Sequence, residues 1–378
     1  MVVSILNRVN YGLEHPAKDL ESVLRVADVP EGGEFFGLGP EDDCPCGSEH
    51  EARCCHRASD HSWIALRPPA LLTDERTGYA NPGCYARHSN DCSRDLTLEH
   101  YLTEDLLEAI SADKKVVMVE GAAWLGKDAK QKTIGMNSLA SRMLCGRHNT
   151  ALSPLDTMAT EFFHHFRADQ LDVMRFQGND FQRDFKLISG PSLELWLLKV
   201  AWGAIEAGAM EVEGSRAYRF RLGVTTQQLA EILWRGAEWP SRWGLYVLHN
   251  QNPDHAVMQN SAQLRPASMG SEILGVFIQI AGFEFLISFE MPPVPRIYRP
   301  CGLTFQRNGF PKRCWKMFAF VWPELGHSMI NVISAVPPDM NFTVPPNEYA
   351  ASIANKIVPG SVKFTSGAQR DRTSCDPW

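Results

Sequence analysis

Apolar residues are most concentrated between positions 192 and 207, where Glu194 and Lys199 interrupt a strongly hydrophobic run. An apolar segment of this length predicts a buried helix at the centre of the core. Residues 149–171 place apolar side chains three and four positions apart, which is the spacing of one helical face. Further helices are predicted over residues 103–110, with Thr103 as N-cap, over 225–237, which opens with the capping box Thr225–Gln228, and over 347–357.

Strand patterns lie between and after these helices. Tyr218, Phe220 and Leu222 alternate with arginines, which is the period of a half-buried strand. Residues 275–280 and 283–289 are two apolar runs joined by Ala281-Gly282, and they predict a β-hairpin. Other strands are predicted over residues 115–120, 243–249 and 317–322. This mixture predicts the α+β fold class.

The composition is that of an ordinary globular protein, with 44% hydrophobic and 21% charged residues. The net charge of −7 argues against a protein that coats nucleic acid through bulk charge. Residues 1–60 hold twelve acidic and five basic side chains and therefore carry this whole net charge. The rest of the chain is balanced, so a local basic groove there is compatible with the composition.

We expect no membrane span. The longest apolar stretches, residues 193–205 and 273–289, contain charged and polar side chains and fall short of about 20 apolar residues. The apolar run at residues 2–6 is too short for the core of a signal peptide. The expected location is the cytoplasm, where cysteines bind metal more often than they form disulfides.

Seven of the ten cysteines lie between positions 44 and 145, in two groups. The first group reads Cys44-Pro-Cys46-Gly-Ser, followed by Cys54, Cys55 and His56. A C-x-C turn and an adjacent Cys-His pair supply four ligands of the kind that zinc binds tetrahedrally. This segment resembles the SEC-C motif, a small zinc module of many bacterial proteins that acts as an adaptor or stability element. The resemblance implies a structural zinc on Cys44, Cys46, Cys55 and His56, and a possible protein partner that docks on this knuckle.

The second group consists of Cys84 and Cys92, then Glu99-His100, and much later Cys145-x2-His148-Asn149. A C-x2-H pair at the start of a helix is a familiar half of a zinc site, and Cys84 with Cys92 can form the other half. The order of features is a cysteine pair, Glu-His, a helix, a strand, a loop, and C-x2-H opening a second helix.

That order resembles a zinc-stabilised HNH (ββα-metal, treble-clef) endonuclease module, and its strongest pieces are Cys92-x6-Glu99-His100 and Leu144-Cys145-Gly-Arg-His148-Asn149. The resemblance implies that Cys84, Cys92, Cys145 and His148 bind structural zinc. It also implies that His100 is the general base, that Asn137 orients it, and that Asn149 holds a catalytic Mg²⁺ or Mn²⁺. Glu99 is a candidate second ligand of that ion.

These residue types suit phosphodiester hydrolysis. Histidine ionises near neutrality and can take a proton from the attacking water. A hard divalent ion offsets charge on the leaving oxygen and prefers amide or carboxylate oxygens as ligands. The alternative is a non-catalytic zinc protein that binds nucleic acid or a protein partner through the same surfaces.

Two basic segments could hold a phosphate backbone. The first carries Lys127, Lys130, Lys132, Arg142 and Arg147 against Asp128 alone. The second, residues 291–316, has six basic side chains, no acidic one and interleaved aromatic residues, as in surfaces that neutralise phosphates and stack on bases. A solvated proline-rich loop is the alternative for this second segment. Nucleic acid, DNA rather than RNA, is the expected partner.

The expected organisation has five parts: an acidic segment (1–40), the SEC-C knuckle (41–60), the HNH-like module (75–175), a mixed α+β C-terminal domain (180–358) and a disordered tail (359–378). The expected function is metal-dependent cleavage of nucleic acid, in the setting of bacterial defence.

Overall fold

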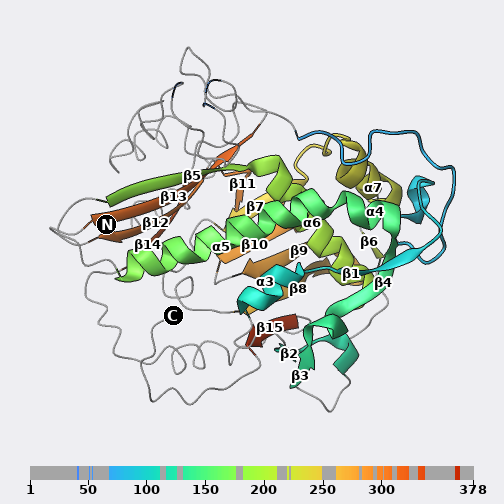
Figure 1. Ribbon diagram of the computed structural model, residues 1–378, viewed down its shortest axis with the longest axis horizontal. Helices are drawn as coiled ribbons and strands as arrows, with labels where there is room; N and C mark the ends of the chain where they lie inside the picture. The colour runs from blue at the N-terminus through green and yellow to red at the C-terminus, as the bar shows by residue number, and fades with distance from the viewer. Residues whose placement is uncertain are drawn as a thin grey trace.

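The computed structural model describes residues 41, 51, 53, 68–110, 116–125, 131–175, 182–210, 219–220, 223–248, 261–280, 283–292, 296–300, 302–308, 313–322, 331–336 and 362–366. Within these residues the protein has an α+β fold (Figure 1). The four ligands expected in the SEC-C segment lie outside the described residues, and so do Lys127, Lys130 and the helix predicted at 347–357.

Helix α6, Gly190–Glu206, is buried along nearly its whole length, as its apolar sequence predicts. Its N-cap is Ser189, whose hydroxyl accepts a hydrogen bond from the backbone N–H of Ser192 at 3.2 Å. Trp196 and Trp202 on this helix are fully buried. The other helices are α3 (Glu104–Ile110), α4 (Gly146–Ala151), α5 (Ser153–Arg175) and α7 (Thr226–Arg235), with 3₁₀ turns η3 (Arg87–Ser89), η4 (Ala123–Leu125) and η5 (Met136–Leu139).

Three sheets surround these helices within the described chain. The smallest pairs β1 (Leu96–His100) with β4 (Ala140–Cys145) in antiparallel register. A four-stranded sheet has the order β14-β12-β13-β5, with bounds Asn331–Val336, Gly302–Asn308, Arg313–Val321 and Gln182–Ser189.

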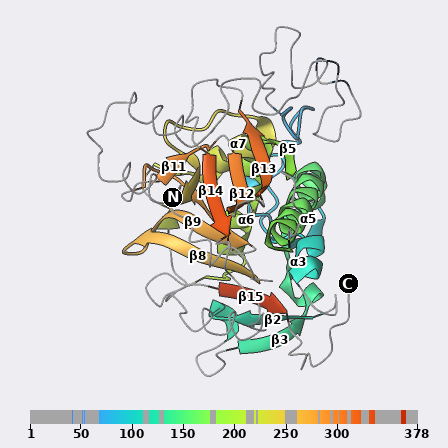
Figure 2. The ribbon, with the colours of Figure 1, turned by 90° about the vertical axis from the view of Figure 1, so that its left-hand side faces the viewer.

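The largest sheet has nine strands in the order β11-β7-β10-β9-β8-β15-β2-β3, with β6 beside β9. Their bounds are Arg296–Tyr298, Gly244–Leu248, Phe283–Ser288, Glu272–Ile280, Ser261–Met269, Val362–Ser366, Val116–Glu120 and Gln131–Gly135, with Arg219–Phe220 for β6. Strands β15, β2 and β3 follow one another at one end of the molecule (Figure 2).

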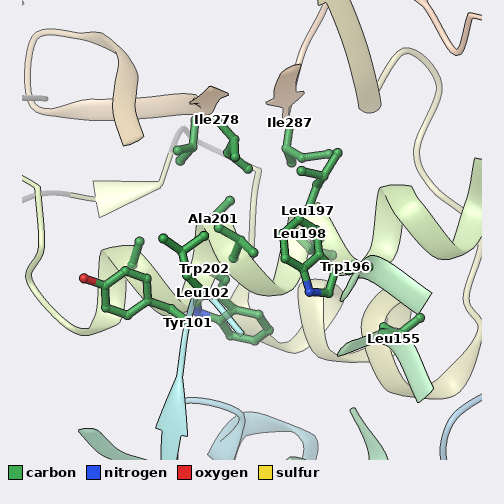
Figure 3. Packing of buried hydrophobic residues seen from close by; sticks show 14 of the residues in the cluster. Tyr101, Leu102, Leu155, Trp196, Leu197, Leu198, Ala201, Trp202, Ile278 and Ile287 are labelled. Atoms are coloured by element: carbon green, nitrogen blue, oxygen red, sulfur yellow. The ribbon is translucent and has the colours of Figure 1, made fainter. Parts of the chain in front are cut away.

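Helix α5 packs against both of the larger sheets. The ring of Phe162 lies 5.2 Å from that of Phe318 on β13, and Phe163 lies 6.2 Å from Phe285 on β10. Helix α6 packs beside it, between Ile278 and Ile287 of the largest sheet on one side and Tyr101 and Leu102 on the other (Figure 3). These buried residues belong to one hydrophobic cluster, which includes residues from both the expected HNH-like module and the expected C-terminal domain.

Several local predictions are confirmed. The backbone N–H of Gln228 donates to Thr225 Oγ1 at 3.1 Å, as the capping box requires. Strands β9 and β10 form the predicted hairpin, with Phe283 opposite Ile280. The helix predicted over 149–171 is divided, because α4 ends at Ala151 and α5 begins at Ser153. The prediction of a disordered tail is wrong for residues 362–366, which form β15 between β2 and β8.

We predict that Phe162→Ala lowers the free energy of unfolding by about 3–5 kcal/mol, because it removes a ring that contacts four other phenylalanines and leaves a cavity. Met291→Ala is the control, since this side chain is 58% exposed, and it should change stability by less than about 0.5 kcal/mol. Urea unfolding followed by tryptophan fluorescence measures both. Equal stability of the two variants would contradict a core that α5 shares with β13.

Candidate metal centre and neighbouring strand

Four side chains that the sequence places in one zinc site do come together. The sulfur atoms of Cys84, Cys92 and Cys145 and a ring nitrogen of His148 all lie within 4.8 Å of one another. All four residues are buried. His148 Nδ1 is 3.1 Å from the Cys145 sulfur and 3.7 Å from the Cys84 sulfur. A buried group with three sulfur donors and one imidazole could bind a metal such as zinc.

The loop that carries Cys84 and Cys92 is held by Asn81. Its side-chain oxygen accepts from the Gly83 N–H at 3.1 Å, and its amide donates to the carbonyls of Ser93 and Arg94 at 3.1 and 2.7 Å. A β-carbon on Gly83 would lie 2.5 Å from Leu96 Cδ1, so any larger residue here would require the Leu96 side chain to shift. These contacts hold the loop against the first residue of β1.

Cys145 and His148 come from the junction of β4 and α4. Cys145 is the last residue of the strand and the N-cap of the helix, which places His148 one turn later on the same side. The backbone N–H of Ser93 donates to the Cys145 sulfur at 3.3 Å. The C-x2-H spacing thus brings both ligands to the Cys84–Cys92 loop.

The hydrogen bonds of His148 select which nitrogen faces the sulfurs. The Ser89 hydroxyl donates to the Ala86 carbonyl at 2.8 Å, so toward His148 Nε2, 3.3 Å away, it acts as an acceptor. Nε2 then carries the hydrogen, and Nδ1 presents its lone pair to the cysteines. Such an outer partner is the usual companion of a metal-binding histidine.

The thiols differ in acidity. A hydrogen bond from Cys84 is the largest effect on Cys145 and lowers the pKa of its thiol to about 3. The same interaction, with burial, raises the pKa of the Cys84 thiol. Cys145 is therefore the sulfur that loses its proton first, and a thiolate is the form that binds metal.

Helix α7 covers this cluster, although the sequence placed it in another domain. Trp234 packs its ring edge-on to His148 at 4.6 Å, and its indole N–H donates to the His148 carbonyl at 3.0 Å. Arg235 forms an ion pair with the buried Asp91, next to Cys92. Asp91 also pairs with Arg147 at 2.9 Å. No spacing in the sequence indicates these contacts, because the partners are up to 144 residues apart.

The candidate base, His100, ends strand β1 and is half-buried. Its Nε2 lies 3.3 Å from the Met136 carbonyl, which directly precedes Asn137 in the turn η5. If Nε2 donates this bond, Nδ1 is left to accept a proton. The structure thus brings His100 to the loop that carries Asn137, but the contact is made by the backbone of Met136, and the Asn137 side chain is exposed.

Asn149 on α4 is tied to the same strand. Its amide nitrogen donates to Thr97 Oγ1 and to the Leu98 carbonyl, both at 3.0 Å. These bonds use the nitrogen and leave Oδ1 as the atom that could bind a cation. Leu98, which binds Asn149, precedes His100 by two residues. Along the strand, these two positions are roughly 7 Å apart.

The structure does not support Glu99 as a second ligand beside His100. Neighbouring residues of a strand point to opposite faces, and Glu99 points into the core. Its carboxylate pairs with Lys199 Nζ on α6 at 2.7 Å. Burial raises the pKa of Glu99, and Lys199 opposes that rise. This carboxylate is therefore committed to an internal ion pair.

The predicted basic residues divide into two kinds. Lys132 and Arg142 are exposed, as a phosphate contact requires. Arg147 instead forms ion pairs with Asp74 at 2.6 Å and with Asp91, so its charge is used within the protein. Of the second basic segment, Arg299 pairs with the buried Glu194 and Arg296 pairs with Glu284. These two arginines are used in ion pairs within the protein, so neither a phosphate-binding surface nor a solvated loop describes them.

Comparison with models of protein families, with curated proteins and with solved structures found no match to this chain. Among the helices that the structure describes, none has the length and apolar content needed to cross a membrane.

We predict that Ser89→Ala weakens zinc binding about 10–100-fold, because Nε2 of His148 loses the acceptor that orients the ring. Competition with a chromogenic chelator measures this affinity on the purified protein. Ser138→Ala is the matched control, since Ser138 is exposed and lies outside the cluster. The same affinity in Ser89→Ala as in wild type would contradict binding through Nδ1.

Proposed function

We propose that this protein is a metal-dependent endonuclease of the HNH type, which hydrolyses phosphodiester bonds in DNA. The observation that carries the proposal is the arrangement around β1. This strand holds a half-buried histidine whose ring contacts the Met136 carbonyl, and it also binds the amide of Asn149. The cysteine–histidine cluster lies at the other end of the same β1–β4 pair, where Leu96 is opposite Cys145.

In the proposed reaction His100 accepts a proton from the water that attacks the phosphorus atom. A histidine is suited to this role because its ordinary pKa lies near neutral pH. Asn137 lies in the turn η5, which contacts His100, and Lys132 lies in β3, the strand before that turn. Both residues are exposed, and a phosphate backbone would pass beside them. Asn149 Oδ1 would hold a Mg²⁺ or Mn²⁺ ion, which would offset charge on the leaving oxygen.

Zinc on Cys84, Cys92, Cys145 and His148 has a structural role in this proposal. Four protein ligands complete a tetrahedral site and leave no open position for a substrate. The cluster joins the loop before β1 to the junction of β4 and α4, and so fixes the strand that carries His100 relative to the helix that carries Asn149.

We predict that His100→Ala lowers the rate of DNA cleavage about 100–10,000-fold, the usual contribution of a general base. Supercoiled plasmid with Mg²⁺ or Mn²⁺, analysed on gels over time, measures the rate. His164→Ala, which removes an exposed histidine on α5, should leave cleavage unchanged. Both variants should retain zinc. Equal nicking by wild type and His100→Ala, or none by wild type on several substrates, would favour the non-catalytic zinc protein.

We predict that Lys132→Ala and Arg142→Ala each weaken DNA binding and reduce the slope of log affinity against log salt by about 1, as expected when one phosphate contact is lost. Arg147→Ala should act differently, because this guanidinium holds Asp74 and Asp91 beside the cluster. It should lower the melting temperature and leave the salt slope unchanged. Fluorescence anisotropy of a labelled duplex between 50 and 200 mM salt distinguishes these outcomes.

A further inference from the structure

Lys199 is a fully buried cation, with 1% of its surface exposed, on the apolar helix α6. Its ammonium group has three acceptors at close distance: Glu99 Oε1 at 2.7 Å, Asp156 Oδ1 at 2.8 Å and the backbone carbonyl of His100 at 2.8 Å. The ammonium donates hydrogen bonds to Asp156 and to the His100 carbonyl and forms an ion pair with Glu99. Two of the three acceptors belong to the adjacent residues Glu99 and His100 at the end of β1.

One helical turn further along α6, Gly203 makes a second contact with the same segment. A β-carbon at this position would lie 2.8 Å from Cβ of Tyr101, the residue after His100. Lys199 and Gly203 are four residues apart and therefore share one face of the helix. Figure 3 shows Tyr101 and Leu102 on the side of α6 that faces away from Ile278 and Ile287. Helix α6 thus contacts residues 99–102 directly.

Strand β1 depends on such a support. Within the described chain it has one strand neighbour, β4, and the register of that pair shifts between Thr97 and Glu99. A two-stranded pair is weakly defined by its own hydrogen bonds. The position of His100 therefore depends also on what packs on β1 beyond β4. Asn149 binds β1 at Thr97 and Leu98, and Lys199 is the polar group that contacts Glu99 and His100 from α6.

Stability alone does not explain a buried charge at this place. Apolar side chains of similar volume often replace a buried ion network without loss of stability. An ammonium adds directional contacts, because its two hydrogen bonds and its ion pair hold the carbonyl of His100 and the carboxylates of Asp156 and Glu99 around one atom. Trp196 completes this arrangement through a bond from its indole N–H to Asp156 at 3.1 Å.

We propose that Lys199 is a positioning residue of the candidate active site, which holds the backbone of His100 so that its ring stays on the Met136 carbonyl. The proposal rests on the nuclease function proposed above. It also assigns Glu99 a role: this carboxylate orients Lys199 from inside the core and does not bind the catalytic ion.

The first test replaces the whole network. Lys199→Met alone leaves two carboxylates without their cation and is expected to be strongly destabilised. The triple variant Glu99→Met/Asp156→Asn/Lys199→Met leaves no unpaired charge and keeps an acceptor for Trp196. Its melting temperature should lie within about 3 °C of wild type. Its kcat should fall about 100-fold, with KM nearly unchanged, because a displacement of about 1 Å has an effect of this size.

The second test separates positioning from metal binding. In Glu99→Gln the amide oxygen stays beside Lys199, so the Mg²⁺ concentration for half-maximal rate should stay within about twofold of wild type, whereas loss of an ion ligand would raise it at least tenfold. Lys186→Met is the control for loss of an ion pair, since Lys186 pairs with Asp169 of α5 at 2.9 Å, away from β1. It should keep the kcat of wild type.

A readout that needs no cleavage distinguishes failure of this inference from failure of the proposed function. The ¹H–¹⁵N signal of His100 Nε2, assigned by its loss in His100→Ala, should show the hydrogen bond to Met136 in wild type and lose it in the triple variant. If wild type does not cleave DNA, the proposed function fails while this signal still tests the positioning. A stable triple variant with unchanged kcat or an unchanged His100 signal would overturn the inference, as would a raised Mg²⁺ requirement in Glu99→Gln.

Discussion

A helix that is apolar on nearly every side has to be covered on every side, and α6 imposes this constraint on the rest of the protein. The largest sheet covers one side through residues such as Ile278 and Ile287, and helix α5 packs beside it. The remaining side is covered by residues 99–102 and by α7. Segments on both sides of position 180 therefore meet on one helix, and they form one hydrophobic cluster.

Because distant segments share one hydrophobic core, some parts of the structure could be predicted from the sequence and others could not. Signals that depend on a few neighbouring residues were reliable: the capping box at Thr225, the hairpin at Ala281-Gly282, and the C-x2-H pair that opens α4. The α+β class followed from the same local patterns. The meeting of Cys84 and Cys92 with Cys145 and His148 could be predicted because the chemistry of thiolates and imidazole is specific enough to join distant segments.

The partners of individual charges could not be predicted in this way. Glu99 adjoins His100 in the sequence, which suggests an ion ligand, but in strand β1 the two side chains point to opposite faces. Arg147 belongs to a basic segment in the sequence, but Asp74 and Asp91 neutralise it in the fold. A signal for Lys199 was present: a lysine within an apolar helix needs buried acceptors, although the sequence does not say which ones.

Strand β15 has a consequence for how the protein is made. Residues 362–366 lie between β2 and β8, so the hairpin of β2 and β3 joins the largest sheet through a strand that is translated more than 220 residues after it. Synthesis proceeds at about 5–20 residues per second, so the edge of β2 stays unpaired for at least about ten seconds and that of β8 for at least about five seconds. Until then β2 and β8 are open to pairing with other chains, which is the usual hazard of exposed strand edges. A chaperone that shields nascent chains would have its clearest substrate here, in the interval before β15 leaves the ribosome.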